Sequence, residues 1–136
     1  MAEVSSNKVA IITGGSRGVG AATARLLASK GWNITITCTS SMDDAENVVK
    51  ECEKLGVEAI AITADVSEDN SCVLTAQETI EKWGRIDALV NNAGTTKFVF
   101  NHADLDGLDA EDFLHIYKVN VVGPFQMVRA CKEMLL

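Results

Sequence analysis

Short apolar runs alternate with longer amphipathic segments along this chain. Val, Ile and Thr dominate the short runs, which is typical of buried strands, whereas the longer segments carry the Ala, Leu, Lys and Glu typical of helices. The predicted strands are Val9–Ile12, Ile34–Cys38, Val57–Thr63 and Ile86–Val90. The predicted helices run from a glycine-rich turn to Lys30, from Ser40 or Ser41 to about Leu55, from a Ser67 cap to about Trp83, and from Asp109 to the end of the chain.

The order of a strand followed by a helix occurs four times. Parallel strands joined by helices of this length need right-handed crossovers, which place helices on both faces of one sheet. The pattern therefore predicts an α/β fold: an incomplete Rossmann-type, doubly wound parallel sheet of four β–α units, in a single domain over residues 1–136. In such sheets, ligands bind beyond the carboxyl ends of the strands.

A glycine-rich turn joins the first strand to the first helix. Glycine tolerates positive φ and has no Cβ, so a pyrophosphate can approach the backbone and the helix can pack closely on the strand. The N-terminus of the helix attracts phosphate, although a tight turn with no ligand is the alternative. We favour nucleotide binding, with these predicted contact residues: Gly14, Ser16, Arg17, Gly18, Val19 and Gly20.

Other polar residues also follow strands, where helix capping and simple turns are the structural alternatives. An acid after the second strand would bind a ribose 2′-hydroxyl, but this chain has none before Asp43. Because Arg17 could instead bind a 2′-phosphate, NADP is the expected cofactor and NAD is less favoured. The further predicted cofactor contacts are Ser40, Asp65, Val66, Asn91, Asn92, Ala93 and Gly94.

Composition narrows the range of partners. Lys and Arg total 12 against 19 Asp and Glu, and this net charge of −7 disfavours nucleic acid and anionic membranes. No apolar run approaches the length of a membrane span, and the polar first residues do not resemble a signal peptide. The four cysteines lack metal-ligand spacing, so we expect no metal site and reduced thiols in a cytoplasmic protein.

Two motifs together resemble the short-chain dehydrogenase/reductase family, and within it the 3-oxoacyl-ACP reductases. They are the Thr-Gly-x-x-x-Gly-x-Gly turn that begins at Thr13 and the Asn-Asn-Ala-Gly that begins at Asn91. The resemblance implies an NADP-dependent oxidoreductase that transfers hydride between a carbonyl and an alcohol of a small-molecule substrate. It also implies a homo-oligomer, contact of Asp65 with the adenine amino group, and a catalytic role for Asn120.

The sequence adds its own argument at Asn120. Pro124 has no N–H to donate to the Asn120 carbonyl four residues earlier, so the helix should kink and that carbonyl should be free. In the enzymes that this chain resembles, a water held there links the asparagine to a lysine, and a plain proline kink is the alternative. His102 and His115 have no partner at ligand spacing, so we expect structural or solvated roles.

The family's remaining catalytic residues are a Ser and a Tyr-x-x-x-Lys downstream of the asparagine. The only tyrosine here, Tyr117, precedes Asn120, and residue 121 is Val. The last helix is apolar on most faces, and the fourth strand would be a sheet edge. We therefore expect the inactive N-terminal portion of a truncated reductase, with this helix covered by further chain or a partner. The alternative is a non-catalytic nucleotide-binding or interaction module that ends naturally at Leu136.

Overall fold

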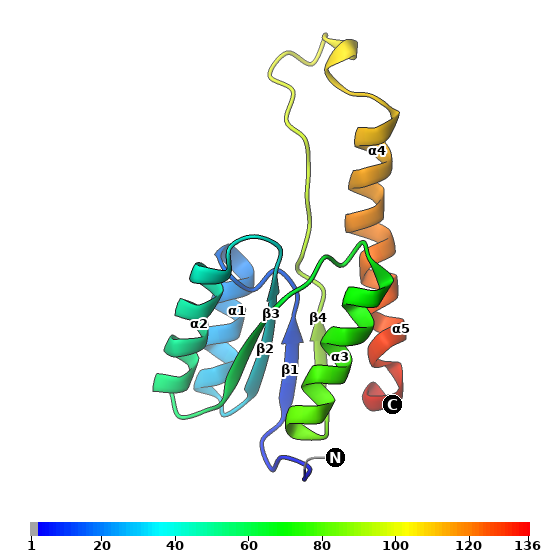
Figure 1. Ribbon diagram of the computed structural model, residues 1–136. Coiled ribbons are helices and arrows are strands. Elements are labelled where there is room, and N and C mark those ends of the chain that lie inside the picture. Colours follow the sequence, from blue (N-terminus) through cyan, green and yellow to red (C-terminus); the bar gives the residue numbers. More distant parts are fainter. Residues whose placement is uncertain (1–2) are drawn as a thin grey trace.

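A computed structural model describes residues 3–136 and contains one four-stranded sheet (Figure 1). Every neighbouring pair of strands is parallel, and the strand order is β3-β2-β1-β4. The strands are β1 (Val9–Ile12), β2 (Asn33–Cys38), β3 (Ala59–Thr63) and β4 (Ala88–Val90). This arrangement confirms the predicted Rossmann-type α/β fold, and it places β4 at an edge of the sheet within the described residues.

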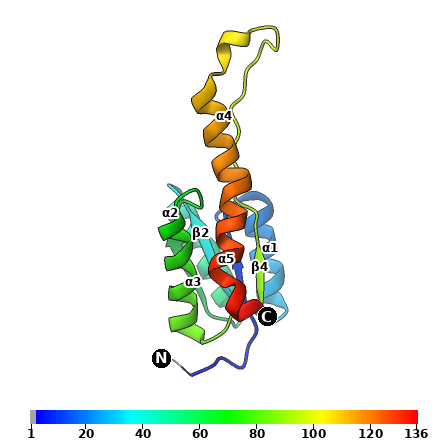
Figure 2. The same ribbon diagram turned by 90° about the vertical axis from the view of Figure 1, so that its right-hand side faces the viewer.

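Helices cover both faces of the sheet (Figures 1 and 2). Helices α1 (Gly18–Ser29) and α2 (Met42–Lys54) pack together on one face. Helices α3 (Asp69–Trp83) and α5 (Gly123–Leu135) pack together on the other. The remaining elements are the 3₁₀ turn η1 (Leu105–Gly107), α4 (Ala110–Tyr117) and the π turn η2 (Lys118–Val122).

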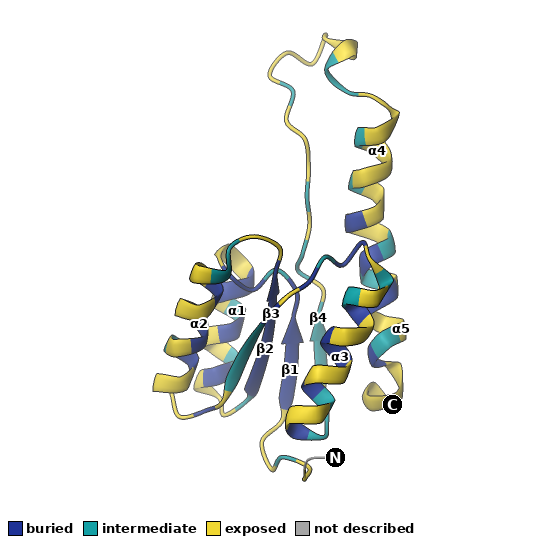
Figure 3. Cartoon of the chain, viewed as in Figure 1, coloured by how far each residue is buried: buried dark blue, intermediate teal, exposed yellow. Residues whose placement is uncertain are grey.

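Two apolar clusters hold these layers on the sheet, whose central strands β1 and β2 are buried, whereas β3 and β4 are mostly of intermediate exposure (Figure 3). Ile12 faces the cluster with α1 and α2, whereas Ile11 faces the cluster with α3 and α5. Adjacent residues of a strand point to opposite faces, so two successive isoleucines, both fully buried, serve both clusters. This explains why β1 reads as a continuous apolar run.

Several element boundaries differ from the predicted ones. Strand β2 begins one residue earlier than predicted, at Asn33, and strands β3 and β4 each begin two residues later, at Ala59 and Ala88. Ser67 does not cap α3, because its hydroxyl donates to Asp65 Oδ1 at 2.7 Å and its N–H donates to the same oxygen at 3.0 Å. Glu68 takes the N-cap position without a side-chain bond.

The predicted last helix begins with a capping box and contains one interruption. The Asp109 side chain accepts from the N–H of Asp112, and the Asp112 side chain accepts from the N–H of Asp109, both at 3.0 Å. The π turn η2 lies just before Pro124, the residue near which a kink is expected, and in it the Gly123 N–H donates to the Lys118 carbonyl. A π turn lengthens the hydrogen-bonded loop by one residue, which suits a backbone that meets a proline lacking an N–H.

The loop after β4 and helix α4 project beyond the carboxyl ends of the strands (Figures 1 and 2).

The apolar side of the last helix was predicted to be covered, but within residues 3–136 much of it is exposed (Figure 3). The exposed side chains of this helix surface are Phe113, Leu114, Tyr117, Val121, Phe125 and Val128.

None of the helices within residues 3–136 has the length and apolar character needed to cross a membrane.

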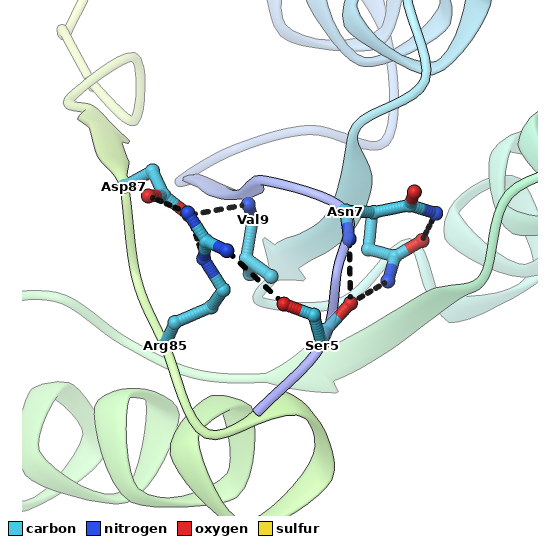
Figure 4. Close-up of polar contacts among 6 residues, drawn as sticks. Ser5, Asn7, Val9, Arg85 and Asp87 are labelled. Carbon is cyan, nitrogen blue, oxygen red and sulfur yellow. Dashed lines mark hydrogen bonds and ion pairs between the residues drawn. The ribbon is translucent and has the colours of Figure 1, made fainter. Parts of the chain in front are cut away.

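A polar network closes the opposite end of the sheet, at the start of β1 (Figure 4). Asp87 Oδ2 accepts from the Val9 N–H at 2.8 Å, and both Asp87 oxygens accept from Arg85. Arg85 also donates to the Ser5 carbonyl at 3.0 Å, while Ser5 Oγ accepts from the Asn7 N–H. The hydrogen bonds from Arg85 are the main cause that lowers the pKa of Asp87.

Replacing Asp87 by Asn should therefore make the stability less dependent on pH. A carboxyl whose pKa is lowered in the folded state stabilises it above the ordinary value of 3.8, and this contribution is lost as pH falls through the folded pKa. We expect Asp87→Asn to cost about 1 kcal/mol of unfolding free energy at pH 7 and progressively less below pH 4. Urea unfolding at pH 7 and pH 3 measures both values.

The matched control is Glu133→Gln, which changes an exposed carboxylate near the end of α5. It should leave the unfolding free energy at pH 7 nearly unchanged. An equal loss for Asp87→Asn at both pH values would contradict the ionic contribution of Asp87.

Candidate cofactor site

A cavity of about 610 Å³ lies at the carboxyl ends of the strands. Nine of the predicted contact residues line it: Gly14, Ser16, Arg17, Gly18, Asp65, Val66, Asn92, Ala93 and Gly94. The lining also contains residues that the motifs did not single out: Thr37, Cys38, Thr39, Ser41, Ala64, Thr95, His115 and Val119. Five predicted residues are outside this lining: Val19, Gly20, Ser40, Asn91 and Asn120.

The glycine turn is packed against the end of β4. Gly14 has φ +65°, and a Cβ there would be 3.0 Å from the Cα of Ala93. Gly20 lies behind the cavity wall, where a Cβ would be 2.6 Å from Asn92 Nδ2 and would also meet the Gly14 carbonyl. Gly20 therefore acts through close packing of α1 on the turn.

Hydrogen bonds fix the same junction. Asn92 Nδ2 donates to the Gly14 carbonyl at 2.9 Å. Thr13 Oγ1 accepts from the N–H groups of Asn92 and Ala93 at 3.1 and 3.0 Å, and the Gly14 N–H donates to Thr37 Oγ1 at 3.1 Å. These hydrogen bonds pair polar groups that would cost folding free energy if they had no partner. They also set the shape of the cavity floor.

The N-terminus of α1 faces the cavity without a capping side chain. Arg17 occupies the N-cap position and makes no side-chain cap bond, and the first turn contains no acid. The first N–H groups of a helix have no partner within the helix, so they and the helix dipole favour an anion here. The exposed Arg17 guanidinium forms no hydrogen bond or ion pair within residues 3–136, so it is available to a ligand.

The end of β2 supplies hydroxyl groups and no carboxylate to the cavity. Ser41 Oγ is 2.7 Å from Ser16 Oγ, which joins this end of β2 to the glycine turn. Ser40 is exposed and lies outside the cavity lining, so Ser41 takes the place that Ser40 was expected to occupy. Cys38 is buried beside it, and desolvation raises the pKa of its thiol.

The turn after β3 forms the facing wall. Asp65 Oδ1 accepts from Ser67, as the simple-turn alternative requires, but no hydrogen bond occupies Asp65 Oδ2 within the described residues. Val66 is 5 % exposed and lines the cavity beside it. This wall combines an acceptor with an apolar surface, which fits a purine base that carries an amino group.

The last helix brings two unexpected residues to the cavity, His115 and Val119, and leaves Asn120 outside its lining. His115 lies in the cavity wall, a position that was not predicted when only a structural or solvated role was expected for it. The Asn120 amide binds the backbone of Thr95 twice, donating to the carbonyl and accepting from the N–H, both at 2.8 Å. Asn120 therefore holds the loop after β4 against the helix.

A glycine turn leading into an uncapped helix, beside a cavity at the strand ends, defines a dinucleotide-binding protein of the Rossmann type. The chain belongs to the short-chain dehydrogenase family, whose model matches residues 8–136. It is 37 % identical over 122 residues to a short-chain dehydrogenase/reductase of Pestalotiopsis microspora, covering 90 % of this chain and 44 % of that protein. It is 43 % identical over 91 residues to a 3-oxoacyl-(acyl-carrier-protein) reductase of Staphylococcus epidermidis, covering 67 % of this chain and 37 % of that one.

Solved structures agree with this assignment. A putative short-chain dehydrogenase/reductase from Burkholderia xenovorans superposes with a TM-score of 0.91 at 38 % identity, over 96 % of this chain and 53 % of that one. A metagenomic short-chain oxidoreductase in complex with NADP gives 0.85 at 31 % identity, over 97 % and 57 %. An NAD⁺-bound xylitol dehydrogenase gives 0.84 at 28 %, over 94 % and 48 %. The chain thus spans about half the length of the proteins that it matches.

Gly20→Ala should damage the site through the junction of α1 with β4. The added Cβ would approach Asn92 Nδ2 and displace the glycine turn, so we expect a loss of about 2 kcal/mol of unfolding free energy. We also expect NADPH binding to weaken at least tenfold. Urea unfolding and fluorescence titration with NADPH measure the two effects.

Gly31→Ala is the matched control for stability alone. Gly31 has φ +89° with open space around the site of a Cβ, so alanine there should cost about 1 kcal/mol in backbone strain. NADPH binding should be unchanged in this variant. If both variants bound NADPH like the unmodified chain, Gly20 would have no part in shaping the cavity.

Proposed function

We propose that this chain forms the cofactor-binding portion of an NADP-dependent oxidoreductase that interconverts a carbonyl and an alcohol on a small-molecule substrate. The observation that carries the proposal is the uncapped N-terminus of α1, which faces a cavity between the glycine turn and the Asp65–Val66 wall. Membership of a family of oxidoreductases supports the reaction class. Burial of all four cysteines as free thiols is compatible with a cytoplasmic location.

Different residues around the cavity would contact different parts of such a cofactor. The first N–H groups of α1 would bind the pyrophosphate, and Asp65 Oδ2 would accept from the adenine amino group. Arg17, with the Ser41 hydroxyl nearby, would bind a ribose 2′-phosphate. The absence of a carboxylate between Cys38 and Ser41 favours NADP over NAD, while solved relatives include complexes with each.

Asn120 is the proposed catalytic position within these residues. When bound, the nicotinamide cofactor would supply or accept the hydride. Pro124 cannot donate to the Asn120 carbonyl, so that oxygen could hold a water, while the Asn120 amide keeps the Thr95 backbone in place. Proton transfer by a Ser and a Tyr-x-x-x-Lys would need residues beyond these 136. NADPH-dependent reduction of a carbonyl by this chain alone would contradict the proposal.

The exposed apolar side of α4, η2 and α5 favours association with a second copy of the chain. Phe113, Leu114 and Phe125 are each more than 60 % exposed, and they lie on one continuous helical segment. A large apolar surface of this kind marks an interaction site. We therefore propose a homo-oligomer that uses this segment.

Arg17→Ala should weaken the binding of NADPH much more than the binding of NADH. Removal of the guanidinium should weaken NADPH binding by a factor of about 30, because a charge-assisted bidentate contact with the 2′-phosphate is lost. NADH binding should change less than threefold, since NADH has no phosphate at that position. Isothermal titration of both cofactors measures this difference.

Arg25→Ala is the control, because Arg25 also lies on α1 but pairs with Glu51 outside the cavity. It should leave both affinities unchanged. Equal weakening of NADPH and NADH by Arg17→Ala would assign Arg17 to the pyrophosphate or to local structure and would contradict the proposed preference for NADP.

Replacing Phe125 by Ser should shift the chain toward the monomer. We expect the unmodified chain to sediment above the 14.6 kDa of one copy, and Phe125→Ser to lower the average mass. Leu26→Ser is the control, since Leu26 is also exposed but lies on α1. A monomeric unmodified chain would contradict association through this segment.

A further inference from the structure

The turn that forms one wall of the cavity is held by the last helix. Arg129 on α5 pairs with Asp69 at 2.9 Å, and Lys118 in η2 pairs with Glu68 at 3.5 Å. Both pairs are about half exposed, so each contributes little by itself. They nevertheless show that the last helix contacts the start of α3, where the turn after β3 ends.

A buried hydrogen bond makes the more specific contact. Gln126 is 8 % exposed, and its Nε2 donates to the Val66 carbonyl at 2.7 Å. The Cys72 thiol donates to the same carbonyl at 3.3 Å, and burial raises the pKa of this thiol to about 11, so it stays protonated at neutral pH. The Val66 carbonyl thus has two buried donors from two different helices.

Close packing restrains the Val66 side chain as well. A Cβ on Gly123 would lie 2.7 Å from Val66 Cγ2 and 3.2 Å from the Val66 carbonyl oxygen. The start of α5 therefore fits against Val66 from behind while Val66 lines the cavity in front. A shift of α5 would move Val66, and with it the adjacent Asp65.

We propose that Gln126, which lies outside the cavity, is a positioning residue that holds the Asp65–Val66 wall in the geometry needed to recognise adenine. The inference rests on the proposed function, because it assigns this wall to the adenine of the cofactor. Gln126 acts only through the Val66 carbonyl, so its loss should alter base recognition more than phosphate binding. Gly123 has the same role through packing.

The test compares NADPH with its hypoxanthine analogue, in which an oxygen replaces the adenine amino group. The unmodified chain should prefer NADPH, because Asp65 can accept from the amino group. Gln126→Leu keeps the side-chain bulk and removes the donor, so NADPH binding should weaken about tenfold. The preference for NADPH over the analogue should fall toward one, as measured by titration of the folded proteins at low temperature.

Two further variants separate positioning from general stability. Gly123→Ala should reproduce the loss of base preference by pressing on Val66. Thr79→Val removes a buried hydroxyl of α3 that lies 2.9 Å from Thr35 Oγ1, so it should lower the melting temperature without changing either affinity. If Gln126→Leu and Gly123→Ala kept both the affinity and the base preference, the inference would be overturned while the proposed function stood. If the unmodified chain bound neither dinucleotide, the proposed function would fail together with the inference.

Discussion

The close approach of the glycine turn to the end of β4 is the constraint on which the site depends. Gly14 and Gly20 leave no room for a Cβ, and the Asn92 amide binds the Gly14 carbonyl across this contact. Thr13 Oγ1 adds two further bonds to the end of β4. Because β1 is paired with both β2 and β4, a displacement at this point would change the floor of the cavity and the direction of α1.

The two faces of the sheet contribute unequally to the cavity. The face with α1 and α2 provides the anion-attracting helix terminus and the hydroxyl groups of the glycine turn and the β2 end. The other face provides the Asp65–Val66 wall, which α3 and α5 hold from behind. At the far end of the sheet, Asp87 binds the first residue of β1 and Arg85 binds the segment before it, so hydrogen bonds connect these strands at both ends.

Local signals in the sequence identified most of the fold and much of the cavity lining. The glycine turn, the apolar strands and the Asp109 capping box depend on neighbouring residues, so they could be recognised without the structure. Ser40 was expected at the cavity and Ser67 at a helix cap, but side-chain direction at a turn depends on the packing of the whole loop. His115 could not be placed because a helix pattern alone does not show which side faces a distant strand end.

The sequence by itself determined the order of strands and helices, the parallel sheet and the glycine turn, because periodicity and glycine chemistry act over a few residues. Membership of the short-chain dehydrogenase family was also accessible from two motifs. Only the tertiary structure decided that Gln126 binds Val66, that Asn120 binds Thr95 and that the last helix leaves its apolar side exposed. Those contacts join residues far apart in the chain, and their geometry depends on how the helices pack on the completed sheet.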